Sequence, residues 1–252
     1  MKKRYIRHAS ELVTCKGSAP KHGKEMSDIG LIKDGAVIIH DDKIVAVGTT
    51  EELDKQINDE YEVIDATGKT VMPGFVDSHT HFIFGGYRAD EFSWRLKGDS
   101  YMSIMERGGG INATVVPTRE ASLEELMETG EERLNRMLEF GVTTVEGKSG
   151  YGMDCETELK MLRAMKNLNE KHPVDIVSTF LGPHSVLPEW KGKEKEFLDE
   201  QLNHVMPIVK EEGLAEFADI FTEKNVFSVE DSEYYMTKAK EMGFKLKIHA
   251  DE

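Results

Sequence analysis

The sequence has few cysteines and no long apolar run. Its two cysteines, Cys15 and Cys155, are far apart and form no C-x-x-C pair. This excludes a zinc ribbon and argues against a disulfide framework. No apolar run approaches the ~20 residues that a membrane-spanning helix needs, and the basic start over residues 1–8 is not followed by the apolar stretch of a signal peptide. We therefore expect a cytoplasmic protein.

Basic residues are also fewer than acidic ones. Lysine and arginine number 32 against 47 aspartates and glutamates, which gives a formal net charge of -15. Proteins that bind nucleic acid need a basic face, and so do proteins that bind anionic membrane surfaces. We therefore expect neither as a partner, and we interpret the acidity as a source of solubility. With 39% hydrophobic residues in 252, the composition is that of a folded globular protein.

Residues 1–66 lack a strong helical pattern and predict a small β domain. Two apolar, β-branched segments at 36–40 and 43–48 flank Asp41 and Asp42, a pair that suits a tight hairpin turn. We place the boundary of this domain between residues 66 and 67.

From residue 67 to residue 252, helices alternate with short apolar strands. Apolar side chains at helical spacing predict helices at 123–140, 157–169, 194–212 and 229–242. Apolar and β-branched runs predict strands at 71–77, 142–145, 174–181, 217–221 and 244–248. This alternation predicts right-handed βαβ units and a parallel sheet. A doubly wound sheet and a (β/α)8 barrel both fit, although a closed barrel needs eight strands.

Histidines occur where three of these strands end. His79 and His81 are two apart on a strand, so their imidazoles point the same way. An H-x-H pair alone is common by chance, but His249 follows the last strand at an equivalent position, and His184 follows strand 174–181. Converging imidazoles suit a borderline ion such as zinc or ferrous iron. We therefore predict that His79, His81 and His249 share one divalent metal ion.

The residues near these histidines favour hydrolysis of a C–N bond. A bound divalent metal lowers the pKa of its water towards ~7 and polarises a carbonyl. Asp251 and Glu252 offer carboxylates that can take a proton, and His184 offers a donor for the oxyanion. Arg88 and the tyrosines offer anchors for an anionic or polar substrate. These residue types predict a metal-dependent hydrolase and leave its substrate open.

Five segments carry a resemblance to a known family. The segment PGFVDSHTH, at residues 73–81 behind a β-rich N-terminal domain, resembles the amidohydrolase superfamily. More specific motifs are similar to those of the imidazolonepropionases of histidine degradation: GGGINATV at 108–115, EGKSGYG at 146–152, ETELKMLR at 156–163 and HADE at 249–252. The resemblance covers about residues 30 to 252.

This resemblance implies a fold and an activity. The fold is α/β, a (β/α)8 TIM barrel of the metal-dependent hydrolase type, to which residues 67–252 contribute about five strands. Residues 1–66 form part of a small β-sandwich domain built from both chain ends. The implied reaction opens the cyclic amide of 4-imidazolone-5-propanoate with water to give N-formimidoyl-L-glutamate. Zinc or iron is the implied cofactor, and a homodimer is the implied assembly.

The resemblance also assigns roles to single residues. The implied metal ligands are His79, His81 and His249, as the strand ends already predict. His184 and Glu252 are implied to be catalytic. The residues implied to hold the substrate are Arg88, which reaches its carboxylate, and Tyr101, Tyr151, His184 and Glu252.

The family pattern extends past the last residue of this sequence. It includes an aspartate on barrel strand eight, as metal ligand and general base, and a further histidine on strand six. We therefore expect this sequence to be part of a longer protein, with the aspartate beyond residue 252. Two alternatives stay open: another cyclic amidase or an aminohydrolase of the superfamily, and an inactive truncated chain that acts only as a metal-binding module.

Overall fold

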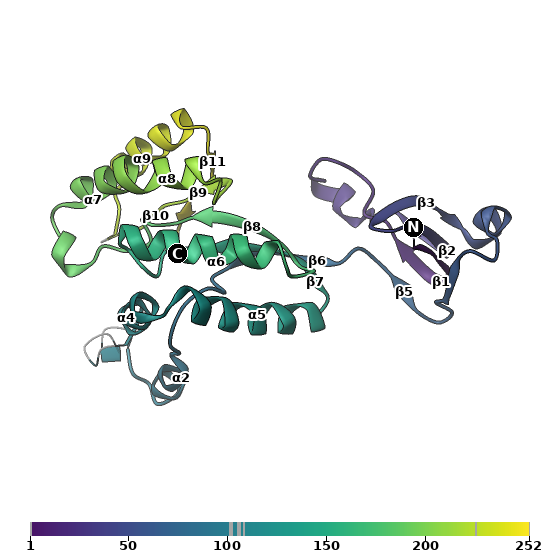
Figure 1. Cartoon of the computed structure of the whole chain (residues 1–252), viewed down its shortest axis with the longest axis horizontal. Coiled ribbons are helices and arrows are strands. Elements are labelled where there is room, and N and C mark those ends of the chain that lie inside the picture. The colour runs from purple at the N-terminus through teal and green to yellow at the C-terminus, as the bar shows by residue number, and fades with distance from the viewer. Residues whose placement is uncertain (1, 101–102, 105–106, 108, 225, 252) are drawn as a thin grey trace. The chain divides into compact units, whose positions relative to one another are not determined.

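A computed structural model describes residues 2–100, 103–104, 107, 109–224 and 226–251. Tertiary contacts divide the chain into two compact units, Met1–Gly74 and Phe75–Glu252 (Figure 1). Within the described ranges, no helix is both long and apolar enough to cross a membrane.

Unit 1 is built on one five-stranded sheet. Its strands are β1 (Lys3–Val13), β2 (Leu31–His40), β3 (Lys43–Thr49), β4 (Glu62–Asp65) and β5 (Thr70–Val71). The order is β3-β2-β1-β4, and β5 also pairs with β1. Short helical turns accompany the sheet: α1 (Thr50–Leu53) and the 3-10 turns Gly23–Ser27 and Asp54–Gln56. The described residues of this unit form one sheet, so the second layer of a sandwich is not seen in them.

The predicted hairpin of unit 1 is confirmed. His40 and Lys43 are partners in the antiparallel pair of β2 and β3, and Asp41 between them adopts the left-handed conformation that such a turn requires. Strand β1 had no specific signal in the sequence. Its buried residues Tyr5, Ala9 and Leu12 are four and three apart, because an irregularity in the pairing with β2 interrupts the two-residue alternation of a strand.

Unit 2 is built on a five-stranded sheet in the order β11-β9-β8-β7-β6, in which every pairing is parallel. Its strands are β6 (Phe75–Thr80), β7 (Val142–Lys148), β8 (Asp175–Phe180), β9 (Phe217–Ala218) and β11 (Lys245–Leu246). A parallel pair, β10 (Phe221–Thr222) and β12 (His249–Ala250), follows β9 and β11 along the chain. Because the strands are parallel, their carboxyl ends meet at one edge of the sheet.

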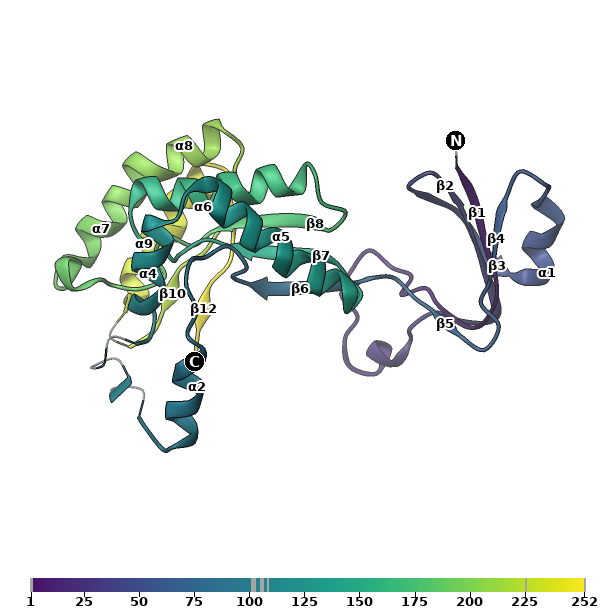
Figure 2. The same ribbon diagram turned by 60° about the horizontal axis from the view of Figure 1, so that its bottom comes forward.

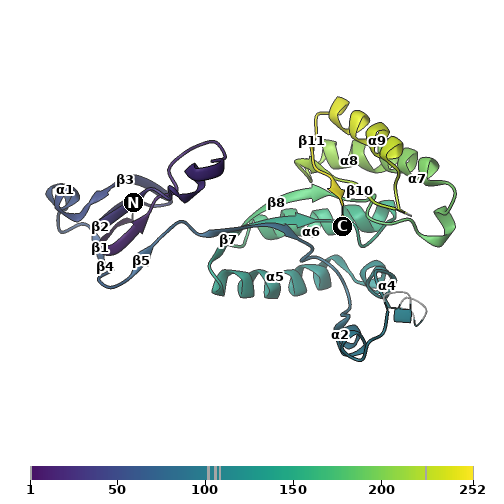
Figure 3. The same cartoon turned by 180° about the vertical axis from the view of Figure 1, so that it is seen from behind.

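Helices connect these strands and cover the sheet. They are α2 (Ala89–Leu96), α4 (Asn112–Glu120), α5 (Leu123–Glu139), α6 (Cys155–Asn169), α7 (Glu194–Glu200), α8 (Met206–Glu211) and α9 (Val229–Glu241), with a 3-10 turn at Pro188–Trp190. Helices α5 and α6 contact each other and run side by side (Figures 1 and 3). Figure 2 shows α5, α6, α7 and α8 on one side of the sheet. Leu134, Met161 and Phe180 are fully buried in the core between helices and strands.

The predicted alternation of helices and strands in unit 2 is confirmed, with several differences. The expected strand at 217–221 is divided into β9 and β10. The expected strand at 71–77 is split into β5 and β6 around Pro73, which lacks the N–H that a strand ladder uses. The expected helix at 194–212 contains a π turn at Gln201–Val205 between α7 and α8. Helices α2 and α4 were not predicted from the sequence.

Candidate functional site

Four residues of the predicted site meet near the carboxyl ends of the parallel strands of unit 2. His79 lies in β6 and His81 directly follows it. His184 comes four residues after the end of β8, and His249 begins β12. The strand-end positions predicted from the sequence therefore correspond to one region of the sheet.

His79 and His249 approach each other directly. Their Nε2 atoms are 3.0 Å apart, and their ring centroids are 4.6 Å apart at an angle of 84°. On the other side of its ring, His249 donates from Nδ1 to the Asp219 carboxylate, at 3.2 Å from Oδ1 and 3.1 Å from Oδ2. With Nδ1 directed at Asp219, Nε2 is the ring nitrogen of His249 that faces His79. Two imidazole nitrogens this close can ligate one ion at ~2.0–2.1 Å each.

His81 takes a different position from the one predicted. Its ring centroid is 6.1 Å from that of His79, and its ring stacks on His184 with a centroid distance of 4.7 Å and an angle of 8°. Its buried Nδ1 has no hydrogen-bond partner among the described residues. In the part of the chain that the structure describes, no three histidine, cysteine or carboxylate side chains are arranged to hold a metal ion. His81 as a third ligand therefore stays a prediction.

A buried charged cluster lies next to the His249 ring and contacts it through Asp219. Lys148 Nζ lies 2.7 Å from Glu146 Oε1 and 2.8 Å from Asp219 Oδ2, and all three side chains are almost fully buried. Lys247 makes a second ion pair with Glu146, also at 2.7 Å. Burial disfavours ionisation of Asp219, but hydrogen bonds from His249 and Lys148 outweigh it and lower the pKa of this carboxyl. Asp219 is therefore an anion that fixes the orientation of the His249 ring.

These supporting residues were missed in the sequence. Glu146 and Lys148 are two apart on β7, so they share one face of a buried strand. Their motif served only as evidence for the resemblance to a family. Charged residues two apart within a strand that is otherwise buried were the available signal.

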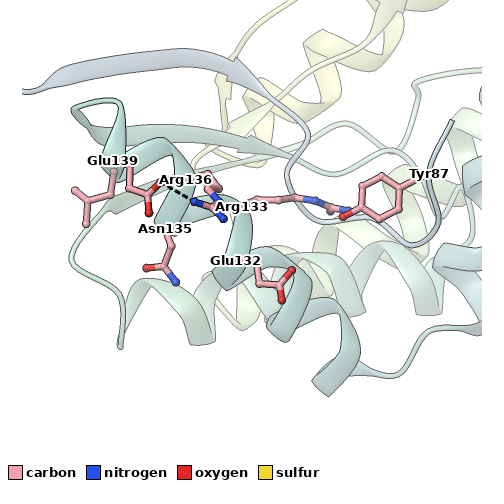
Figure 4. A pocket seen from close by; sticks show the side chains of 7 residues that line it. Tyr87, Glu132, Arg133, Asn135, Arg136 and Glu139 are labelled. Atoms are coloured by element: carbon pink, nitrogen blue, oxygen red, sulfur yellow. Dashed lines mark hydrogen bonds and ion pairs between the residues drawn. The ribbon is translucent and has the colours of Figure 1, made fainter. Parts of the chain in front are cut away.

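A pocket of about 500 Å³ opens over this cluster. It is lined by Ser78, His79, Glu146, Lys148, Asp219, Lys247, Ile248, His249 and Ala250. A larger pocket of about 790 Å³ lies along α5 and is lined by Tyr87, Glu132, Arg133, Asn135, Arg136, Leu138 and Glu139 (Figure 4). It contains no histidine, and its Arg136 is paired with Glu139 at 2.8 Å. The chemistry of the side chains assigns the candidate site to the smaller pocket.

Tyr151 and Arg88 extend the site next to His81. The Tyr151 ring lies 4.9 Å from the His81 ring and 5.4 Å from the His184 ring, centroid to centroid. Burial raises the pKa of the Tyr151 hydroxyl, and the nearby Arg88 guanidinium opposes that rise. Two further residues predicted for the site, Tyr101 and Glu252, lie outside the described residues.

His184 differs from its expected role as a hydrogen-bond donor to an oxyanion. Its Nδ1 lies 2.9 Å from the Gly150 carbonyl oxygen, which only accepts, so Nδ1 carries a proton. Burial lowers the pKa of His184 to about 4, so the ring is neutral at pH 7. Its Nε2 then has no proton and can only accept a hydrogen bond. The structure therefore makes His184 an acceptor towards a ligand.

Comparisons with known proteins bear on this geometry. A model of the amidohydrolase family matches residues 62–114. The chain is 55% identical to an imidazolonepropionase of Parabacteroides distasonis, over 98% of this chain and 60% of that protein. It is 52% identical to the imidazolonepropionase of Clostridium tetani, over 98% and 59%. The resemblance predicted from the motifs is therefore confirmed, and the chain spans about 60% of the length of the curated relatives it matches.

Solved structures support the fold. The chain superposes on E. coli guanine deaminase with a TM-score of 0.62 at 16% identity, over 99% of this chain and 53% of that one. It superposes on the 5-methylcytosine deaminase of Klebsiella pneumoniae with a TM-score of 0.61 at 16% identity, over 98% and 51%. At this identity the likeness concerns the fold alone, and it supports an α/β fold of the amidohydrolase type.

Proposed function

We propose that the protein containing this sequence is an imidazolonepropionase. It hydrolyses the cyclic amide C–N bond of 4-imidazolone-5-propanoate and releases N-formimidoyl-L-glutamate, a step of histidine catabolism. The observation that carries the proposal is the meeting of His79 and His249 at 3.0 Å in the strand-end pocket, in a chain that is 55% identical to a protein of that name.

The residues present fit the metal ion that the proposal requires. Imidazoles suit zinc and iron, the Nε2 atoms of His79 and His249 already face each other, and the buried Nδ1 of His81 has no described partner. In the proposed protein these three histidines hold one zinc or iron ion, with an aspartate beyond residue 252 as a further ligand. A bound ion would lower the pKa of a water molecule and polarise the amide carbonyl.

The remaining roles belong to side chains that surround the histidines. Arg88 binds the propanoate carboxylate, because a guanidinium forms paired hydrogen bonds with a carboxylate. Tyr151 and His184 orient the ring of the substrate, and Tyr101 contributes to the same pocket. Glu252 takes a proton during the attack of water. Asp219 and Lys148 keep the ring of His249 in its orientation.

The finer architecture belongs to the same proposal. Residues 67–252 contribute the five-stranded sheet to a closed (β/α)8 barrel, and residues 1–66 contribute to a β-sandwich. The whole protein is a cytoplasmic homodimer that acts on a small molecule. The parallel order of the strands in unit 2 supports the barrel, since every pairing has the direction that a barrel requires.

The test uses the protein that contains this sequence, with metal content and consumption of imidazolone propionate as readouts. His79→Ala should lose most of the bound ion and most of the turnover. His204→Ala is the matched control, because His204 is exposed and its one ion-pair partner among the described residues is Glu200, at 3.7 Å. Unchanged turnover in His79→Ala contradicts the proposal. Release of ammonia from a purine or pyrimidine, with no ring opening of imidazolone propionate, favours an aminohydrolase instead.

A further inference from the structure

We propose that Glu158 is a positioning residue of the candidate site. It holds the turn at residues 149–153 and, through the Gly150 carbonyl, keeps His184 with a proton on Nδ1 and a free Nε2. The use of that Nε2 for substrate binding rests on the proposed function, whereas the contacts that fix it do not.

Glu158 accepts hydrogen bonds from the backbone amides of the turn. It lies in α6 and is fully buried. Its carboxylate accepts hydrogen bonds from the N–H groups of Gly150 at 2.9 Å, Gly152 at 2.8 Å and Met153 at 2.9 Å. A buried carboxylate is costly unless donors surround it. In the folded protein, three amides of one turn replace the water molecules that would hydrate Glu158. The shape of the turn therefore depends on this side chain.

The turn has a shape that needs such support. Gly150 has a φ of +106° and Met153 a φ of 57°, a left-handed conformation that is unfavourable for a residue other than glycine. N–H groups that converge from a turn of this kind form an anion-binding concavity. The opposite side of the turn is held by Arg119, whose Nε donates to the Gly152 carbonyl at 2.8 Å. Glu158 thus holds three N–H groups of the turn, and Arg119 holds one of its carbonyl groups.

The Gly150 carbonyl connects the turn to His184. It accepts the Nδ1 hydrogen bond at 2.9 Å. A Cβ atom on Gly150 would lie 2.6 Å from the Leu181 carbonyl oxygen and 2.9 Å from His184 Cβ, so only glycine permits this approach. Since the His184 ring stacks on His81, a shift of the turn also moves a ring of the candidate metal site.

The fixed tautomer defines what His184 can recognise. With the single ring proton held on Nδ1 by the Gly150 carbonyl, Nε2 is an acceptor only. The matching group on a ligand is a ring N–H, such as that of a cyclic amide. Among the described residues no hydrogen bond to this Nε2 is present, so its acceptor capacity is unused within the chain. Glu158 thereby acts on the recognition of the substrate without touching it.

The first test uses the metal-free wild-type chain. Nitrogen NMR at pH 8, above the ordinary histidine pKa of ~6.5, reports which ring nitrogen carries the proton, and His184→Gln identifies the signal. We expect a proton on Nδ1. We also expect slow hydrogen exchange at the amides of Gly150, Gly152 and Met153. A proton on Nε2, or exchange as fast as in an exposed loop, overturns the inference without the use of any variant.

The second test compares Glu158→Gln with Glu156→Gln. Glu156 lies in the same helix and is exposed, so its substitution makes the same chemical change away from the turn. In Glu158→Gln we expect a mixture of both His184 tautomers and a rise of about three- to tenfold in KM, as expected for the loss of one hydrogen bond between neutral groups, with a smaller change in kcat. An unchanged tautomer in folded Glu158→Gln overturns the inference.

The outcomes separate this inference from the proposed function. If the tautomer and amide protection are as expected but imidazolone propionate is not consumed, the proposed function fails and the positioning role of Glu158 stands. If Glu158→Gln does not fold, the wild-type tautomer and amide exchange decide the question alone.

Discussion

Asp219 determines which nitrogen of His249 faces the pocket. Its carboxylate accepts from Nδ1 and is itself held by Lys148 at 2.8 Å. Outer partners of this kind raise the basicity of a metal-binding imidazole and fix its tautomer. The orientation of His249 is therefore set by residues that are far from it in the sequence.

For Asp219→Asn we expect metal affinity to fall by about 10- to 100-fold, because the amide leaves His249 less basic and less well oriented. Competition with a chromogenic chelator measures the affinity. Asp175→Asn, at the exposed start of β8, is the control. Equal affinities in Asp219→Asn and in the control would show that Asp219 does not act on the metal ligand.

For Glu146→Gln we expect a loss of stability of about 3–5 kcal/mol at pH 7, the cost of breaking a buried ion pair. Hydrogen bonds from Lys148, Lys247 and Thr179 overcome the effect of burial and lower the pKa of Glu146. Its contribution is therefore complete above the pKa of the unfolded state and is lost as the pH falls through the lower folded-state pKa. Urea unfolding at a series of pH values should show the variant and the wild type converging in acid. A constant difference at all pH values would contradict this assignment.

The sequence predicts the histidines of the site better than the residues that support them. His79, His184 and His249 stand out because they follow apolar strands. Asp219 and Glu158 could not be recognised, because a charged residue next to apolar ones is normally expected at the surface, and for Glu146 the available signal was its spacing of two from Lys148 on β7. Their burial depends on partners that are distant in the sequence or on a turn whose shape is not encoded by a simple motif: Lys148 and Asp219, for instance, are 71 positions apart.

At the scale of single elements, helix ends are marked clearly in the chain. Ser122 accepts from the Glu125 amide at the start of α5, and the Glu125 carboxylate accepts from the Ser122 amide. The same reciprocal arrangement joins Ser228 and Asp231 at the start of α9.

For Ser122→Ala we expect a loss of about 1 kcal/mol of stability, because one amide of the first turn of α5 loses its acceptor. Chemical denaturation of the wild type and the variant measures the difference. Ser18→Ala, in an exposed loop, should change stability by less than about 0.5 kcal/mol. A Ser122→Ala variant as stable as Ser18→Ala would show that α5 does not depend on this cap.

The longer helices were predictable because their apolar spacing persists over three or more turns, whereas the bounds of several strands were not. Strands β9, β10, β11 and β12 contain only two residues each, too few for any alternation to be seen. The π turn at Gln201–Val205 was also beyond prediction, since a single inserted residue barely disturbs the apolar pattern of a helix.

At the scale of the whole molecule, the sheet of unit 2 carries apolar side chains on its outermost strand. Strand β6 is an edge of the five-stranded path, and its Phe75 and Val76 are 53% and 67% exposed. An exposed apolar edge strand favours association with another chain. The alternating helices and strands predicted the parallel sheet, but they do not specify what pairs with its edges.

For Val76→Lys we expect weaker self-association of the 252-residue chain, because a charge on an edge strand opposes pairing. Light scattering after size-exclusion chromatography, over a series of concentrations, measures the average mass. Val116→Lys is a suitable control, because Val116 is similarly exposed but lies in α4. If both variants associate as the wild type does, the edge of β6 is not responsible.

The buried chain of charges also limits how the site can open. Glu146 and Lys148 belong to β7, Asp219 follows β9, and Lys247 lies between β11 and β12. Detaching any one of these segments would leave an unpaired ion in an apolar interior. Local fluctuations should therefore leave these strand ends closed, and they should separate only together, in a rare cooperative event.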